Sequence, residues 1–97
     1  MGLSARWREA YGLMLLQIVY FAAVREAVGI DGEPVEVETG TQIAELIDRM
    51  SRQSERHAAA FLDCAKLRFA LDQKIVRAHA ILDGANELAI FPPVTGG

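Results

Sequence analysis

A segment near the middle of the chain has the apolar spacing of an amphipathic α-helix. Its apolar side chains recur at positions i, i+3, i+4 and i+7, namely Ile43, Leu46, Ile47 and Met50. This spacing puts them in one stripe along a helix, and the stripe has to pack against another layer of the protein. Thr41 precedes the stripe and is the expected N-cap. The pattern therefore predicts a helix that lies across a sheet.

Strand-like segments on both sides of this helix supply the expected sheet. Residues 15–22 are rich in β-branched and aromatic side chains, and residues 34–38 alternate valine with glutamate. We expect these two segments to form paired strands. Between them, residues 23–28 predict a short helical turn that ends at Gly29.

The second half of the chain predicts a short helix followed by a hairpin. The helix, at residues 55–62, is expected to use three apolar side chains: Ala58, Phe61 and Leu62. Residues 67–71 and 74–76 predict the two hairpin strands, with Asp72-Gln73 as the turn. Ninety-seven residues suffice for one modest core, so the pattern predicts a single small α+β domain.

The charge and the cysteine content exclude several classes of function. A net charge of −3 and a pI near 5.3 argue against a nucleic-acid binder, which normally has a basic face. The single cysteine, Cys64, excludes an intrachain disulfide and fits a reducing cytoplasm. Cys64, His57 and His79 are not at paired ligand spacings, so no metal site is predicted. We expect Cys64 to be buried or half-buried and both histidines to lie at the surface.

The acidic strand residues and the start of the chain also have an ordinary interpretation. Glu33, Glu36 and Glu38 are expected to form a solvated strand face.

The apolar residues 13–24 follow two arginines and superficially imitate a signal peptide, but Gln17 interrupts them and they fall short of a membrane span of about 20 residues. We therefore expect a cytoplasmic protein that does not bind membranes.

The last expected strand, residues 87–91, runs directly into an unusual ending. Phe91 is followed by Pro92, Pro93, Val94, Thr95, Gly96 and Gly97. Two prolines end a strand and direct the chain outward, and glycine leaves the terminal carboxylate unhindered. Six extended residues reach roughly 20 Å, far enough to enter a partner's active site. Because no catalytic triad or phosphate-binding loop is evident, the tail is better interpreted as a substrate of other proteins than as a catalyst.

Two stretches resemble the small, sulfur-carrying subunits of molybdopterin synthase. They are residues 90–97, Ile-Phe-Pro-Pro-Val-Thr-Gly-Gly, and residues 21–29, and the resemblance covers about residues 14–97. It implies a ubiquitin-like β-grasp fold, with the first and last strands side by side at the centre of a mixed sheet. It divides the chain into an extension at residues 1–13, a β-grasp domain at 14–91 and a sulfur-carrying tail at 92–97. Either the extension is native or translation starts at Met14.

The resemblance also implies the chemistry of the tail. An ATP-dependent, E1-like activating enzyme would join AMP to Gly97, and a sulfur donor protein would then replace AMP, leaving a thiocarboxylate. The large synthase subunit would bind the tail together with cyclic pyranopterin monophosphate, in a heterotetramer of two small and two large subunits. The chain would then be no enzyme by itself, would hold no permanent cofactor, and would rely on catalytic residues of the large subunit.

Individual residues acquire roles from the same resemblance. Gly97 would carry the sulfur, Gly96 would keep the end of the tail thin, and the rest of the tail, Thr95, Val94, Pro93 and Pro92, would pair with the partner as an extended arm. An apolar patch at the tail base would dock the partners through Phe21, Ile75 and Phe91, each of which is otherwise an ordinary core residue. Arg25 would pair with an acidic partner residue, or else is a solvated helix-end arginine.

Three alternatives remain open at this point. The chain is a sulfur carrier of the same fold for thiamine, cysteine or tRNA thiolation, or a ubiquitin-like modifier joined through Gly97 to other proteins. The third alternative is a binding module with a non-functional tail, since frayed termini are common. Phe-Pro-Pro-Val-Thr-Gly-Gly favours the molybdopterin branch, since the thiamine carriers usually lack the two prolines. Ala85-Asn86 and Asp72 depart from the family's usual residues, but only in loops.

Overall fold

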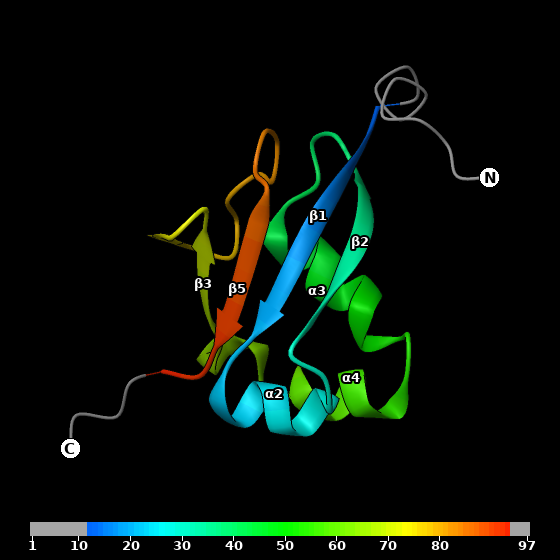
Figure 1. The fold of residues 1–97 in the computed structure, drawn as a ribbon, viewed down its shortest axis with the longest axis vertical. Coiled ribbons are helices and arrows are strands. Elements are labelled where there is room, and N and C mark those ends of the chain that lie inside the picture. The colour runs from blue at the N-terminus through cyan, green and yellow to red at the C-terminus, as the bar shows by residue number, and fades with distance from the viewer. Residues whose placement is uncertain (1–11, 94–97) are drawn as a thin grey trace.

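Five strands form one mixed sheet in the computed structural model, which describes residues 12–93 (Figure 1). The strands are β1 (Leu13–Tyr20), β2 (Gly32–Glu38), β3 (Arg68–Leu71), β4 (Lys74–Val76) and β5 (Glu87–Phe91). Their order across the sheet is β2-β1-β5-β3-β4. The central pair, β1 and β5, is parallel, and the other three pairs are antiparallel. This is the predicted β-grasp arrangement, with the first and last strands side by side.

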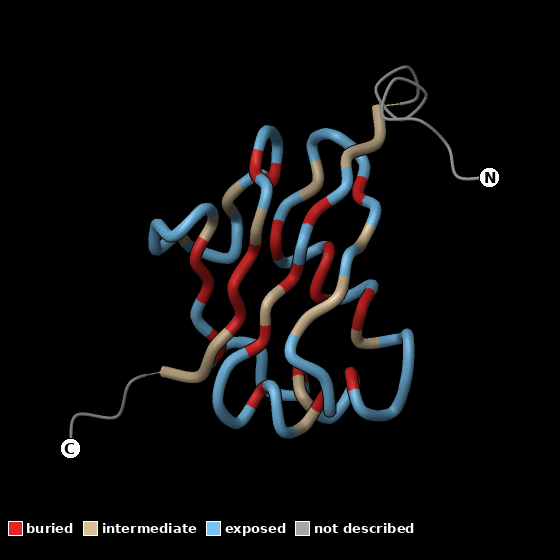
Figure 2. Tube along the Cα trace, in the orientation of Figure 1, coloured by how far each residue is buried: buried red, intermediate tan, exposed pale blue. Residues whose placement is uncertain are grey.

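Helices occupy one side of this sheet. They are α2 (Ala22–Val28), α3 (Ile43–Ser51), α4 (Glu55–Ala60) and the 3₁₀ turn η1 (Cys64–Lys66). In Figure 1, α3 lies behind the sheet, and α2 and α4 lie at the lower end of the strands. The predicted stripe of α3 is confirmed, since all four of its apolar side chains are buried in one cluster with residues of β1, β2, β3 and β5. Figure 2 shows buried residues, in red, along the central strands of the sheet and on the helix behind them.

The N-cap of α3 is Gln42, so the prediction of Thr41 is wrong. The Gln42 backbone N–H donates to Glu45 Oε1 at 2.9 Å, and the Gln42 side chain accepts from the same turn, which makes a capping box. The Thr41 backbone is instead bonded to the loop before β5, because its carbonyl accepts the Leu82 N–H at 2.9 Å. The loop before β5 therefore fixes where α3 begins.

The helix after α3 buries fewer residues than its pattern predicts. Phe61 is buried, but Ala58 is exposed and Leu62 is 86% exposed. Because α4 is only six residues long and ends at Ala60, Leu62 lies beyond the helix, in the turn that leads to η1.

The hairpin turn and the loop before β5 are tied together by one carboxylate. Asp72 and Gln73 both have positive φ, 47° and 72°, as a tight two-residue turn requires. Asp72 Oδ1 accepts the N–H groups of Asn86 and Glu87 at 2.9 and 3.0 Å. The predicted turn is confirmed, and it also positions the start of β5.

Replacing a core leucine of β5 tests the central position of this strand. Leu88 is fully buried, and Leu88→Ala is expected to lower the free energy of unfolding by about 2–5 kcal/mol, because it removes buried apolar contacts and leaves a cavity. Leu62→Ala is the matched control and is expected to change it by less than about 0.5 kcal/mol. Urea denaturation measures both, and equal effects of the two variants would contradict this view of the core.

Candidate functional site

The tail leaves the sheet at the end opposite to where the chain enters it. Since β1 and β5 are parallel, the start of β1 at Leu13 and the end of β5 at Phe91 lie at opposite ends of the sheet (Figure 1). Pro92 and Pro93 follow Phe91 and are half-buried. The predicted sulfur-carrying residues and the remainder of the arm lie outside the described residues: Val94, Thr95, Gly96 and Gly97. The site can therefore be built only from the tail base.

The face of the sheet away from the helices carries small and large apolar side chains at the tail base. Ile75, Ala70, Ala89 and Val19 lie opposite one another in successive strands and form a row across four of them. Their neighbours along the strands, such as Ile90, point into the core, so alternation turns this row to the other face. The row is therefore an apolar surface on the face of the sheet that points away from the core.

Phe21 and Phe91 extend this apolar surface to the end of the sheet. The Phe21 N–H donates to the Ile90 carbonyl at 3.1 Å, which continues the pairing of β1 with β5 and brings Phe21 beside Phe91. Phe21 is 46% exposed, Ile75 is 71% exposed and Phe91 is half-buried. We call Phe21, Ala70, Ile75, Ala89 and Phe91 the apolar face. The three large side chains predicted for the interface thus lie on one face of the sheet, and none belongs to the core cluster.

Arg25 lies on α2, which starts directly after Phe21. Its Nε is 4.0 Å from Asp31 Oδ1, at the limit of an ion pair, and both side chains are at least half exposed. A contact of this kind contributes little, so the guanidinium can exchange Asp31 for another carboxylate. Arg25 is therefore placed to serve as a polar contact near the apolar face.

A buried polar cluster joins α4 to β1 and β2, and the sequence did not predict it. Tyr20 Oη donates to Glu33 Oε2 at 2.6 Å, and His57 Nε2 lies 2.7 Å from the same oxygen. On the other side of the imidazole, Ser54 Oγ lies 2.7 Å from Nδ1 and accepts the His57 backbone N–H at 3.1 Å. His57 was expected at the surface and Glu33 on a solvated face, and both expectations are wrong. His79, Glu36 and Glu38 are exposed as predicted.

Burial and hydrogen bonding shift the pKa values of Tyr20 and Glu33 in this cluster. Burial raises the pKa of the Tyr20 phenol, and the hydrogen bond to Glu33 and its negative charge raise it further, so Tyr20 stays a donor. Burial alone would raise the pKa of Glu33, but hydrogen bonds from His57 and Tyr20 and the attraction of a protonated His57 together hold it below its ordinary value. A paired, ionised Glu33 therefore fastens α4 to the sheet, which is a structural role.

The pH dependence of stability tests this cluster. Because the pKa of Glu33 is lowered by folding, its ionised form stabilises the fold above the ordinary value of about 4.5, and this contribution is lost as the pH falls through the lower, folded-state pKa. Glu33→Gln is expected to lose about 1–3 kcal/mol at pH 7 and to approach the parent protein in acid. Glu38→Gln, an exposed neighbour on β2, is the control and should leave the pH profile unchanged. Parallel profiles for parent and Glu33→Gln, measured by urea denaturation between pH 3 and 7 (about the range of carboxyl titration), would contradict this role.

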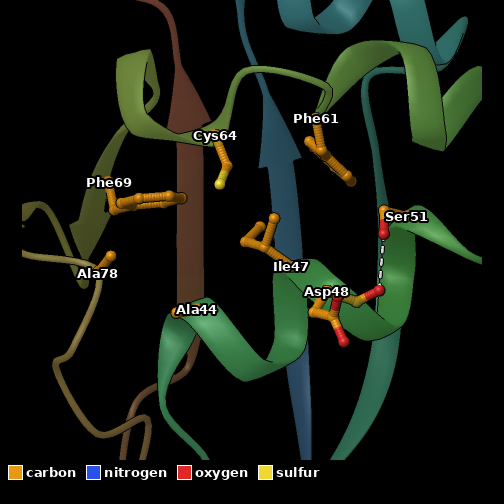
Figure 3. Close-up of a pocket in the computed structure, with 8 residues that line it drawn as sticks. All are labelled: Ala44, Ile47, Asp48, Ser51, Phe61, Cys64, Phe69 and Ala78. Carbon is orange, nitrogen blue, oxygen red and sulfur yellow. Dashed lines mark hydrogen bonds between the residues drawn. The ribbon is translucent and has the colours of Figure 1, made fainter.

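Cys64 is exposed, so the expectation of a buried or half-buried thiol is wrong. Its Sγ points into an apolar cavity of about 140 Å³ between η1 and α3 (Figure 3). The other lining residues come from α3, from the turn after α4, from β3 and from the loop after β4: Ala44, Ile47, Asp48, Ser51, Phe61, Phe69 and Ala78. In residues 12–93 there is no group of three His, Cys, Asp or Glu side chains suited to hold a metal ion. Nor is any helix in that range long and apolar enough to cross a membrane.

Residues 18–97 match the ThiS family. This chain belongs to the ThiS family. The match extends to Gly97 and so includes the tail together with most of the sheet. Membership is shown by sequence over more than half of the chain, and the fold described above agrees with it.

Named relatives place this ThiS-family chain more narrowly. It is 42% identical over 84 residues to the molybdopterin synthase sulfur carrier subunit of Escherichia coli strain K12, a match that covers 86% of this chain and the whole of that protein. The fold is similar to a putative molybdopterin converting factor, subunit 1, from Pyrococcus furiosus, with a TM-score of 0.67 and 24% identity over 84% of this chain and 99% of that one. It is also similar to a chain in the complex of subunits 1 and 2 of the molybdopterin-converting factor from Helicobacter pylori, with a TM-score of 0.53 and 20% identity over 87% and 100% of the two chains.

Proposed function

We propose that this protein is the sulfur carrier subunit of a molybdopterin synthase. The observation that carries the proposal is the 42% identity to the Escherichia coli sulfur carrier subunit, which covers that protein from end to end. The match covers 86% of this chain, and we propose residues 14–97 as the functional unit. The same relative favours molybdenum cofactor synthesis over thiamine, cysteine or tRNA thiolation and over protein modification.

The proposed chemistry takes place at Gly97. The Gly97 carboxylate attacks the α-phosphorus of ATP on the activating enzyme, which releases pyrophosphate and forms an acyl-adenylate. A persulfide on the sulfur donor then displaces AMP, and a thiol cleaves the resulting acyl disulfide to leave a thiocarboxylate. This sulfur is softer and less strongly hydrated than a carboxylate oxygen, so it is a useful nucleophile once a partner excludes water. Two loaded carriers would supply the two sulfurs of one dithiolene.

The folded domain would position the tail in its partners and would not itself catalyse the reaction. Gly96 would keep the end of the tail narrow enough to enter a partner's active site, and Thr95, Val94, Pro93 and Pro92 would form the extended arm. Phe21, Ile75 and Phe91 would dock the large subunit and the activating enzyme in turn, with Arg25 as a charged contact at the rim. We propose catalytic residues on the large subunit and a complex of two small and two large subunits in the cytoplasm.

The mass of the tail tests the sulfur-carrier role directly. After incubation with its activating enzyme, ATP, a persulfide donor and a thiol, the protein is expected to gain about 16 Da, the difference between sulfur and oxygen, as measured by intact-mass spectrometry. A chain that lacks Gly97 should fold normally and show no gain, because its new terminus does not fit the activating enzyme. Molybdopterin formation with the truncated chain would contradict the proposal.

A charge introduced on the apolar face tests its docking role. Ile75 is largely exposed, so Ile75→Glu is expected to leave the free energy of unfolding unchanged but to weaken binding of the large subunit by about tenfold or more, because it buries an unpaired carboxylate. Leu62→Glu introduces the same charge at a more exposed leucine in the turn after α4 and is the matched control. Isothermal titration calorimetry measures both, and equal affinities for the two variants would exclude Ile75 from the interface.

A further inference from the structure

A groove at the edge of the sheet combines basic and apolar lining. It has a volume of about 620 Å³ and lies between η1 and the edge strand β4. Arg68, Arg77 and His79 contribute its polar side chains, and Ile75 and Ala78 are among its apolar ones. Among residues 12–93, no aspartate or glutamate lines it. The groove is thus locally basic on a chain whose net charge is −3.

The cations at this groove differ from most others in their partners. Arg25, Arg52 and Lys66 each lie within ion-pair distance of an aspartate. Arg68, in contrast, donates only to the backbone carbonyls of Ala65 and Leu67, at 3.4 and 3.0 Å.

Two further cations next to the groove have no ion-pair partner within the described part of the chain. These are Arg77, in the groove lining, and Lys74, on β4. Together with Arg68, they leave three positive side chains at this edge of the sheet without a carboxylate. Such a site attracts an anionic ligand.

An apolar cavity opens beside the groove. The 140 Å³ cavity in Figure 3 shares Cys64, Phe69 and Ala78 with the groove lining. A cavity of this size lies below the range of about 300–1,000 Å³ that is usual for small-molecule and cofactor sites. It is better matched to one apolar side chain of a longer ligand than to a whole metabolite.

The groove also continues the apolar face. Ile75 belongs to both surfaces, and Arg68 lies opposite Phe91 in the register of β3 and β5. A protein docked on the apolar face therefore lies next to the groove and can extend a segment around the edge strand into it.

We infer that the groove and cavity bind an acidic segment of the large subunit, with one apolar side chain in the cavity and carboxylates on Arg68 and Arg77. The inference rests on the proposed function for the identity of the partner. The surface chemistry favours a peptide over a nucleic acid, because the lining combines its basic side chains with apolar ones. Carboxylates in this groove would add a charged contact to the apolar docking surface and fix its orientation.

Peptide titrations test the site without the partner. The peptide acetyl-EEFEE-amide, added to ¹⁵N-labelled full-length protein, is expected to shift amide signals of residues 64–69 and 75–79. Acetyl-EEGEE-amide, which lacks the apolar anchor, should bind more weakly, and acetyl-KKFKK-amide should not bind. Absence of shifts with acetyl-EEFEE-amide at millimolar concentration would overturn the inference, as would tighter binding of poly(U) at the same amides.

A pair of charge reversals tests the site in the complex. Arg77→Glu is expected to weaken binding of the large subunit by about tenfold, because it removes one charge pair and places like charges opposite each other. Arg56→Glu changes the net charge equally, at an exposed position of α4 outside the lining of the groove and the cavity, and should weaken binding less than about twofold. Dispersed amide spectra confirm that both variants fold, and Arg77→Gln should fall between parent and Arg77→Glu. Equal weakening by Arg77→Glu and Arg56→Glu would overturn the inference.

Failure of this inference is distinguishable from failure of the proposed function. If the groove is not a docking site, Arg77→Glu binds the large subunit normally and Gly97 still gains the mass of sulfur. If the protein is not a sulfur carrier, the parent protein itself shows no mass gain.

Discussion

The parallel pairing of β1 with β5 determines where everything else in this protein lies. The two strands are separated by most of the sequence, and they meet at the centre of the sheet with Tyr20 opposite Ile90. Because they run in the same direction, β5 delivers Phe91 and the two prolines to the end of the sheet where β1 passes into α2. Phe21 and Arg25 therefore come next to the tail base, although they stand some seventy residues before it in the chain (roughly the span between the two strands).

The alternation of side chains along these strands gives the sheet two different apolar faces. Leu88 and Ile90 turn to α3 and are fully buried, whereas Ala89 between them belongs to the opposite face. The side chains at the centre of that face are alanines, at positions 70 and 89. The larger side chains of Ile75 and Phe21 therefore project beyond them. An exposed apolar surface of this form on an otherwise charged protein is typical of an interaction site. The core thus stabilises the fold, and the opposite face is the surface that we propose for docking.

Periodic and local features of the fold were predictable from the sequence, and contacts between distant segments were not. The α3 stripe and the Asp72-Gln73 turn depend on residues that are close in sequence, and both are confirmed. The predicted N-cap at Thr41 is wrong because the Thr41 carbonyl accepts the N–H of Leu82 instead. Leu82 lies roughly forty residues further along the chain. The β-grasp topology followed from the resemblance at the two ends of the chain and not from periodicity.

The candidate site also combines features that could be predicted from the sequence with contacts between distant segments that could not. Phe21, Ile75 and Phe91 were assigned to the interface by resemblance, and the structure places all three on one face. His57 and Glu33 were misassigned because each is an ordinary surface residue by composition. Their burial depends on three segments, β1, β2 and α4, that meet only in the folded chain. One local signal existed, since Ser54 three residues before His57 marks a helix start at which the third residue faces the capping side chain.

The composition of the tail explains why the body must supply most of the binding surface. Of the four residues after Pro93, two are glycines with no side chain, and the others are one valine and one threonine. Their burial in a partner removes little apolar area from water, at about 25 cal/mol per Å², so they contribute little affinity of their own. A carrier must nevertheless bind its partners well enough to be loaded and then leave each of them. The proposed docking through a separate apolar face and a charged edge would meet both needs, because affinity and orientation could be adjusted there without widening the tail.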